Sequence, residues 1–242
     1  MKTIGKKRIV TFIMAALMAL CALTACGEPV ENASSAESGW KAHKFGTGDL
    51  TVNGVSLGMT AEEVKDKLGK PDKEENVTED QFIYGEHLDI NYGKMLLSFY
   101  DISGEGNSTL SSISTYSPEV EFPGGLHVGS TKEEVLAAFA QDDNAPDLEF
   151  YGEKYGTFIY GDMTSGDFLS KKPTGVIEAA YIQDHDAEED GYYMMIYTYY
   201  NPLKWSEDGN EFSGDYYQLV FYVDTATDKV TSILLSHDLT TL

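Results

Sequence analysis

An internal repeat constrains the fold of this chain more than any other feature of its sequence. Residues 54–64 (GVSLGMTAEEV) align with residues 125–135 (GLHVGSTKEEV) at a constant offset of 71, and Gly, Gly, Thr, Glu, Glu and Val recur at matching places. Two later motifs recur in the same order: FIYG at residues 82–85 and 158–161, and LSFY at residues 97–100 as LVFY at residues 219–222. The preserved order indicates a tandem duplication.

Each copy of the repeat opens with a signal for the start of a helix. Thr60 with Glu63, and Thr131 with Glu134, have the T-x-x-E spacing of a capping box. In this motif the Thr hydroxyl accepts a hydrogen bond from the N–H three residues on, and the Glu side chain accepts one from the Thr N–H. A short apolar face follows each box, and Gly69 is expected to end the first helix. The sequence therefore predicts a helix at the start of each copy.

The rest of each copy has the pattern of strands, with β-branched and aromatic residues between Gly, Asn and Asp turns. In the first copy we expect strands at residues 81–84, 87–92, 94–101 and 110–116. The second copy is longer, and its extra residues include expected strands at residues 175–183 and 192–200, joined by an acidic loop at residues 184–191. This insertion, at about residues 162–215, is expected to add a long hairpin to the sheet.

These patterns together predict an α+β fold. We expect two tandem units, each a helix followed by an antiparallel sheet, and the two sheets are expected to join into one with the helices on one face. The first unit is expected at residues 51–120 and the second at residues 121–242.

The N-terminus has the features of a bacterial lipoprotein signal. Basic residues precede an apolar run at residues 9–23, which ends in the sequence LTACG at residues 23–27. About 15 apolar residues are too few to span a hydrocarbon core, which needs roughly 20, but they suit a secretory signal. The LTACG sequence resembles the lipobox, which implies that residues 1–25 are removed and that a diacylglyceryl group is attached to Cys26. The mature protein is then expected outside the cytoplasmic membrane, held to it by lipid.

The cysteine count limits the chemistry of the mature chain. Cys21 lies in the segment expected to be removed, and Cys26 is expected to carry the lipid. No thiol is then left for a disulfide, a cysteine-rich metal site or a cysteine nucleophile. Residues 26–50 are rich in Ser, Ala, Glu and Gly, which predicts a flexible tether whose Trp40 and Phe45 can dock onto the folded domain.

The charge of the chain is strongly acidic. Removal of the signal leaves 13 Lys and Arg against 40 Asp and Glu, a net charge of −27. Nucleic acid is not expected as a partner, because phosphate binding depends on clustered Lys and Arg. The acidity fits either solubility at a crowded surface or binding of a basic partner, and the charge alone leaves both open.

A family resemblance rests on residues 54–71, GVSLGMTAEEVKDKLGKP. This phrase resembles the opening of units in the β-lactamase-inhibitor-protein superfamily and in the small lipoprotein of the outer-membrane β-barrel assembly machine. The resemblance implies helix-then-sheet units whose antiparallel sheet forms a concave protein-binding face, and hence a non-catalytic binding module. The chain departs from the inhibitor family in its lipid anchor, its insertion and its lack of disulfide cysteines.

Tyrosines supply the candidate binding residues. Twelve of the 16 tyrosines follow residue 150, and several lie in residues 192–200, YYMMIYTYY. Alternation along a strand sends Met194, Ile196 and Thr198 to one face, which we expect to be the helix-covered core. The other face is then an exposed surface that carries the predicted partner-binding residues Tyr193, Tyr197 and Tyr199. Ordinary packing of these tyrosines within the sheet is the alternative.

Other motifs give weaker signals, and we expect no catalytic, metal or cofactor site. Residues 54–58 match the G-x-S-x-G motif of serine hydrolases, but the second copy has His127 in place of Ser56, so the glycines are expected to be turn residues. The histidines are scattered, and the acidic loop lacks the spacing of an EF-hand. A hydrolase using Ser56 and an envelope-scaffolding lipoprotein are the alternatives to a protein-binding module.

Overall fold

The computed structural model describes residues 40–78, 86–102, 106–150, 153–162, 173–179, 191–200, 204–205 and 212–241. Contacts divide the chain into residues Met1–Glu37 and Ser38–Leu242, and all described residues belong to the second part. Several sequence predictions lie outside the described residues: the signal peptide, the lipid-modified Cys26, the strand at residues 81–84, and the acidic loop up to residue 190.

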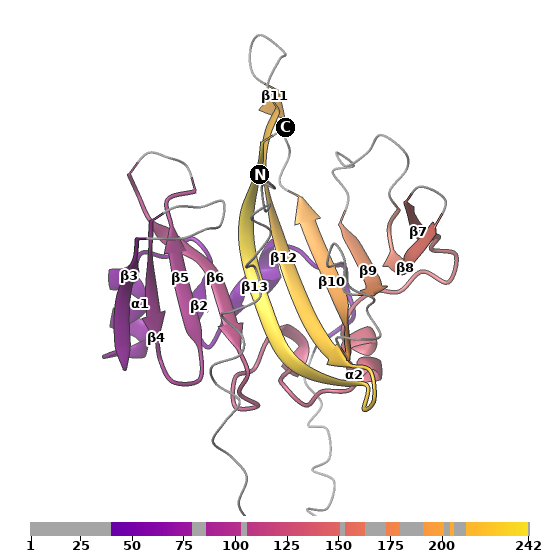
Figure 1. The fold of residues 1–242 in the computed structure, drawn as a ribbon, viewed down its shortest axis with the longest axis horizontal. Coiled ribbons are helices and arrows are strands. Elements are labelled where there is room, and N and C mark those ends of the chain that lie inside the picture. Colours follow the sequence, from indigo (N-terminus) through magenta and orange to yellow (C-terminus); the bar gives the residue numbers. More distant parts are fainter. Residues whose placement is uncertain are drawn as a thin grey trace, which may run out of the picture. The chain divides into compact units, whose positions relative to one another are not determined.

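One large antiparallel sheet dominates the fold (Figure 1). In the described part of the chain it has eleven strands, in the order β3-β4-β5-β6-β13-β12-β10-β9-β8-β7, with β11 paired to β12. The strands are β3 (Lys73–Val77), β4 (His87–Asn91), β5 (Leu96–Tyr100), β6 (Thr109–Thr115), β7 (Asp147–Phe150), β8 (Glu153–Tyr160), β9 (Thr174–Ala179), β10 (Tyr192–Tyr200), β11 (Lys204–Trp205), β12 (Phe212–Asp224) and β13 (Lys229–Thr241).

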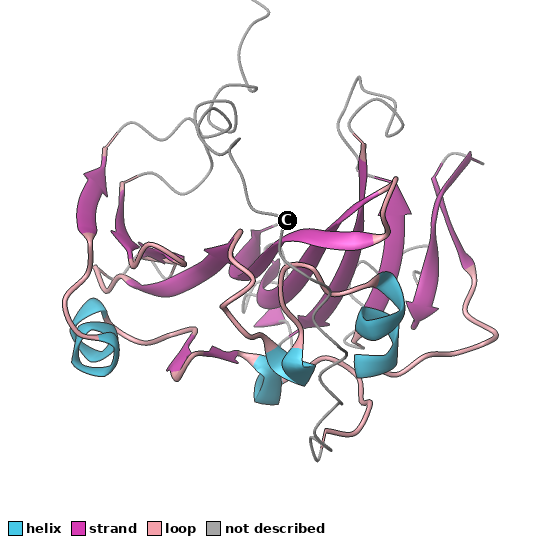
Figure 2. Cartoon of the chain, turned by 90° about the horizontal axis from the view of Figure 1, so that it is seen from below, coloured by secondary structure: helices cyan, strands magenta, loops and turns pink. Residues whose placement is uncertain are grey.

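The helices are few and short, and they lie along one side of the sheet (Figure 2). Among the described residues, the α-helices are α1 (Ala61–Leu68) and α2 (Lys132–Ala138), and the 3-10 turns are η1 (Thr47–Asp49) and η2 (Pro123–Gly125). A small hairpin, β1 (Thr51–Val52) and β2 (Val55–Ser56), precedes α1. We call the opposite side of the sheet, which carries no helix among the described residues, the helix-free face.

The predicted α+β class, with two tandem helix-plus-sheet units, is wrong. The chain is sheet-dominated, because the α-helices have only eight and seven residues whereas β12 and β13 have thirteen each. The strands also do not divide into two successive units, since the C-terminal β13 pairs with β6 and inserts the β12–β13 hairpin into the centre of the sheet. The repeated motif marks where each helix begins, but it does not determine the length of the helix.

The helix starts follow the sequence closely, and both predicted capping boxes are confirmed. Glu63 N donates to Thr60 Oγ1 and Thr60 N donates to Glu63 Oε2, and the same exchange joins Thr131 and Glu134. The first helix ends as predicted at Gly69, whose φ of 82° favours glycine. These caps fix where each helix meets the sheet.

The core lies between the sheet and the helices. Val64 of α1 and Val135 of α2 are fully buried against it. The sheet contributes side chains that alternate along each strand, among them Ile90, Leu97, Phe99, Ile113, Met195, Leu219, Phe221, Ile233 and Leu235. Burial of a side chain of this size stabilises a fold by about 1.5–3 kcal/mol, so this layer holds the helices on one face.

The chain before residue 51 is partly folded, which shortens the tether predicted at residues 26–50. Phe45 is fully buried, and its N–H donates to the Tyr160 hydroxyl at 3.0 Å. Trp40 Nε1 donates to the Ala138 carbonyl at 2.8 Å, as expected of a docking side chain. Residues from Trp40 onward therefore belong to the folded unit.

Candidate functional site

The helix-free face is organised in rows that run across the strands. Strand register aligns a row of polar side chains, Thr174, Thr198, Gln218, Ser236, Ser112 and Ser98. Two residues along each strand, a second row is apolar: Phe158, Val176, Ile196, Val220 and Leu234. The next row holds Met194 of β10 opposite Tyr222 of β12. The face therefore grades from polar to aromatic along the strands.

The aromatic end of this face forms a cluster, the tyrosine patch, that consists of Tyr116, Tyr192, Met194 and Tyr222. The Tyr192 and Tyr222 rings meet edge to face with centroids 5.7 Å apart. Burial raises the pKa of Tyr222, and the neighbouring Tyr192 and Tyr116 raise it further. Such contacts hold the rings in place.

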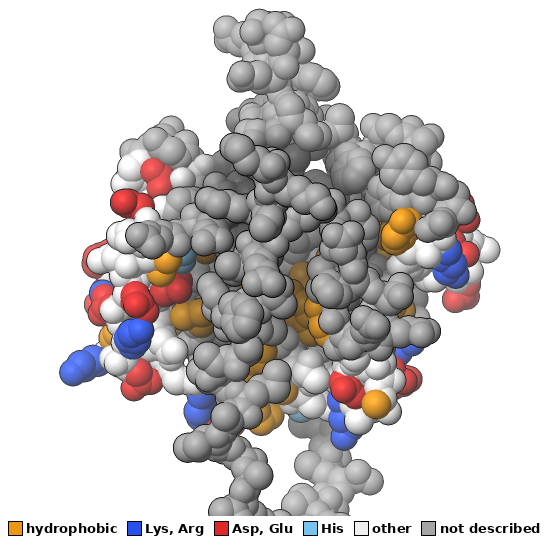
Figure 3. All heavy atoms as spheres, viewed as in Figure 1, with side chains coloured by type: hydrophobic (Ala, Val, Ile, Leu, Met, Phe, Trp, Pro, Cys, Tyr) orange, Lys and Arg blue, Asp and Glu red, His pale blue; other side chains and the backbone are white. Residues whose placement is uncertain are grey.

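Large hydrophobic side chains are exposed in the tyrosine patch and in the neighbouring apolar row. Among the described residues, the exposed large hydrophobics are Tyr116, at 64%, and Leu96, at 36%. Leu96 pairs with Ser114, which in turn pairs with Leu234 of the apolar row. Figure 3 looks onto this face; where described atoms are visible near its centre, hydrophobic side chains (orange) can be seen, and acidic ones (red) lie mostly toward the edges.

The three predicted binding tyrosines lie on the opposite, helix-covered side. Tyr197 is fully buried; its ring centroid is 4.2 Å from that of Phe139, and its hydroxyl has no hydrogen-bond partner among the described groups. Tyr193 donates a 2.8 Å hydrogen bond to Asp228 Oδ1, and Tyr199 lies 6.3 Å from Tyr217, ring to ring.

The expected assignment of the two faces is therefore reversed. Residues 193, 195, 197 and 199 face the core, where burial raises the pKa of Tyr197. Met194, Ile196 and Thr198 lie on the helix-free face instead. The physical reason lies in β12, where Leu219, Phe221 and Val223 are strongly apolar and fully buried. They pair with Tyr197, Met195 and Tyr193 of β10, so these three residues share the core-facing side of the sheet.

Sequence reasoning missed the tyrosine patch for the same reason. Met194, and by alternation Tyr192, belong to the strand set that the sequence predicts for the core, and Tyr116 and Tyr222 are distant in the sequence. The useful signal was the alternation of β12, whose odd-numbered residues are much more apolar than Gln218 and Tyr222. Pairing β12 with residues 192–200 would have shown which face of each strand is buried in the core.

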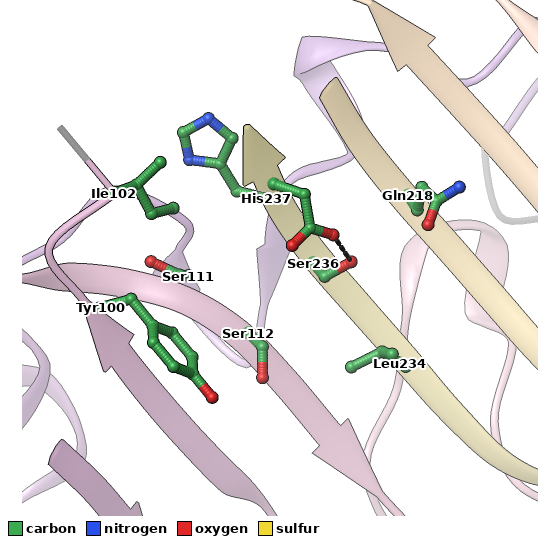
Figure 4. A pocket seen from close by; sticks show the side chains of 9 residues that line it. Tyr100, Ile102, Ser111, Ser112, Gln218, Leu234, Ser236 and His237 are labelled. Atoms are coloured by element: carbon green, nitrogen blue, oxygen red, sulfur yellow. Dashed lines mark hydrogen bonds between the residues drawn. The ribbon is translucent and has the colours of Figure 1, made fainter. Parts of the chain in front are cut away.

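A hollow of about 300 Å³ opens at the polar end of the helix-free face (Figure 4). It lies where β6 and β13 separate, because their pairing ends at Ser112 and Ser236 while β13 continues along β12 to Thr241. Its walls come from four strands and one loop: Tyr100, Ile102, Ser111, Ser112, Gln218, Leu234, Ser236, His237 and Asp238.

The sequence Ser236-His237-Asp238 in this wall does not form a catalytic triad. Neighbouring residues in a strand point to opposite faces. Ser236 and Asp238 share a face, where the Ser236 hydroxyl donates to Asp238 Oδ2 at 3.3 Å, while the His237 ring points away from Ser236 (Figure 4). The His237 ring stacks on Tyr217, with ring centroids 4.4 Å apart. The imidazole therefore cannot activate the Ser236 hydroxyl.

The other motifs have structural roles in the fold. Ser56 lies in β2 with its hydroxyl 2.6 Å from that of Thr51, and the preceding Asn53 and Gly54 both have positive φ, as in a tight hairpin turn. Gly125 and Gly129 of the second copy also have positive φ, so the shared glycines are turn residues. Within the described ranges, no group of three or more potential metal ligands gathers.

Comparisons with protein-family models, with curated proteins and with solved structures found no match to this chain. No helix in the part of the chain that the structure describes is long and apolar enough to cross a membrane.

Proposed function

We propose that this protein is a lipid-anchored, extracytoplasmic module that binds another protein through the tyrosine patch of its sheet. The observation that carries the proposal is the exposed Tyr116 beside the packed pair Tyr192 and Tyr222 on the helix-free face. Tyrosine is enriched in protein interfaces, because it combines a large apolar area with a polar tip. A sheet with thirteen-residue central strands gives these rings a rigid support.

The anchor is supported by the sequence. The apolar run followed by LTAC at residues 23–26 is the pattern of a lipoprotein signal, and lipid on Cys26 would hold the sheet near the outer surface of the cytoplasmic membrane or within the envelope. A partner in the envelope, or one passing through it, is then within reach of the tyrosine patch.

The test is crosslinking and capture of proteins from the cell envelope and the culture fluid. Tyr116→Ala and Tyr222→Ala variants are compared with the parent and with Tyr92→Ala. Tyr92 is a matched control because it contacts the α1 end, where its hydroxyl donates to the Gly69 carbonyl. We expect a partner captured by the parent and by the control to be lost or much reduced with the two patch variants. Equal capture by all four proteins would refute the patch as the contact face.

A further inference from the structure

The first described residues of the chain, Trp40–Lys44, lie on the surface of the domain, and we call them the docked segment. Trp40 Nε1 donates to the Ala138 carbonyl at 2.8 Å, and the Ala140 N–H donates to the His43 carbonyl at 2.9 Å. Residues 41–44 are exposed, whereas Phe45, which follows them, is fully buried. Phe45 therefore fixes the chain to the core, and the docked segment is attached by a small number of polar contacts.

The side chain of His43 joins the docked segment to the η1 turn. Its Nδ1 lies 2.9 Å from the Lys41 carbonyl oxygen, and its Nε2 lies 3.0 and 3.1 Å from the two carboxylate oxygens of Asp49. Asp49 is buried, and its Oδ2 also accepts a hydrogen bond from the Gly46 N–H at 2.9 Å. Both ring nitrogens of His43 therefore face oxygens that accept hydrogen bonds.

These contacts are complete only when His43 carries two N–H groups. A neutral imidazole has one N–H and one lone pair, whereas an imidazolium has two N–H groups. Whichever nitrogen keeps the proton in the neutral ring, the other one points a lone pair at an acceptor oxygen. The Asp49 carboxylate also loses the positive charge beside it. Deprotonation of His43 therefore weakens the attachment of the docked segment.

We propose that His43 is a pH-dependent latch, which holds the docked segment on the domain while its imidazole is doubly protonated and releases it at higher pH. The contacts with the Lys41 carbonyl and with Asp49 raise the pKa of His43 above 6.5. A raised pKa in the docked state stabilises docking below the pKa of the released segment. This contribution is lost as the pH rises through the docked value.

The other groups around the imidazole do not titrate near neutral pH. Asp49 of η1 is the charged side chain that acts on it. Tyr160 of β8 lies beyond Asp49, and burial raises its pKa, so its hydroxyl stays neutral. Lys44 Nζ lies over the Tyr160 ring, 5.4 Å from its centroid. Two aromatic rings lie beside the imidazole, with centroids 4.8 and 6.3 Å away: Trp40 and Phe139.

Release of the docked segment would lengthen the tether between the lipid and the domain. This consequence rests on the proposed anchor at Cys26, whereas the latch itself does not. The domain holds the chain from Trp40 when the segment is docked and from Phe45 when it is released, so five more residues join the tether. An extended chain spans at most 3.3–3.6 Å per residue, so the reach of the domain would increase by about 17 Å.

The test follows the exposure of Trp40 with pH in the full protein, purified in detergent. Trp205→Phe leaves Trp40 as the only tryptophan, and acrylamide quenching of its fluorescence lifetime measures its access to solvent. Acrylamide is uncharged, so the charge on His43 does not affect its approach. We expect the quenching constant to rise between pH values of about 5.5 and 8.5. The midpoint of this rise is expected above pH 6.5, and circular dichroism at each pH verifies that the sheet stays folded.

Variants in the same background assign the rise to His43. His43→Gln does not titrate, so we expect its quenching constant to be independent of pH. His127→Gln is the matched control, because His127 Nδ1 also lies 2.9 Å from a backbone carbonyl oxygen but belongs to another segment. We expect His127→Gln to keep the rise. Asp49→Asn is the second variant in case His43→Gln fails to fold, and removal of its charge should shift the midpoint to lower pH.

Three results would overturn the latch: a quenching constant that does not change with pH in the parent, a rise that persists in His43→Gln, or a rise that is lost equally in His127→Gln. A midpoint that stays the same in Asp49→Asn would overturn the role of the His43–Asp49 pair. None of these results depends on lipid at Cys26 or on a partner at the tyrosine patch. Failure of the latch and failure of the proposed function are therefore distinguished.

Discussion

At the scale of single residues, Tyr197 is a fully buried side chain of β10 that packs in the aromatic part of the core. Its ring packs against Phe139 and Phe221, and its hydroxyl is buried without a hydrogen-bond partner among the described residues. A buried hydroxyl without a partner loses its hydrogen bonds to water and gains nothing in return. The residue is therefore held in the core by its ring, and its hydroxyl adds no stability.

This burial predicts opposite outcomes for two substitutions of Tyr197. Tyr197→Phe should leave the free energy of unfolding unchanged or raise it, because only the unpaired hydroxyl is lost. Tyr197→Ala should lower it by about 3–5 kcal/mol, because a cavity replaces the ring. Urea unfolding followed by circular dichroism measures both. A clear loss of stability in Tyr197→Phe would mean that the hydroxyl has a partner.

Gly175 makes room for two of the core tyrosines. A Cβ atom at this position would lie 2.8 Å from Tyr160 Cε1 and 3.1 Å from Tyr197 Cδ1. Gly175→Ala should therefore lower the free energy of unfolding by about 1–3 kcal/mol through overpacking. Gly48→Ala is the control, because nothing lies within 4 Å of its Cβ position. If the two variants unfold at the same urea concentration, the packing around Gly175 is looser than described.

At the scale of elements, helices α1 and α2 depend on their caps, because each has only about two turns. Thr131→Ala removes the side-chain acceptor of the Glu134 N–H and should lower the free energy of unfolding by about 1 kcal/mol. Thr131→Ser keeps a hydroxyl in the same place and should recover most of this loss. Thermal and urea unfolding of the two variants compare them directly, and equal stability would argue against a cap at Thr131.

The segment before β1 contains a pH-sensitive pair. His43 Nδ1 hydrogen-bonds to the Lys41 carbonyl and Nε2 lies 3.0 Å from Asp49 Oδ1; these contacts raise the pKa of His43 above 6.5. A raised pKa in the folded state stabilises the fold below the unfolded pKa, and this contribution is lost as the pH rises through the folded value. Stability should therefore decline as the pH rises from about 6.5, and His43→Gln should flatten this decline. An identical pH profile for the variant would exclude His43 as the source.

The elements also show what the sequence could and could not reveal. Helix starts were predictable, because a capping box is local, and so was β10, whose bounds agree with residues 192–200. The edge strand β3 was missed, because its sequence KEENV is almost entirely polar and exposed. The prediction of which face of β10 is buried was wrong, because alternation along a strand defines two faces but does not show which of them the helices cover. The hollow had no local signal, since Tyr100, Gln218 and Asp238 meet only through the pairing of distant strands.

At the scale of the whole molecule, the proposed anchor and the proposed binding face act together. Lipid on Cys26 would confine the protein to a membrane surface, where the acidic charge would repel anionic headgroups. Cys26→Ser should abolish metabolic labelling with a radioactive fatty acid and release the protein from the membrane fraction, whereas Cys21→Ser should do neither. Labelling that survives in Cys26→Ser would contradict the anchor and leave the binding face untouched.

The most direct test of the central claim is photocrosslinking from the tyrosine patch in living cells. Benzoylphenylalanine is placed at Tyr116 and, in a separate variant, at Tyr92. We predict an adduct with another protein that depends on ultraviolet light at position 116 and is absent at position 92. An adduct from position 92 alone, or none from position 116, would contradict the proposal that the helix-free face binds a partner.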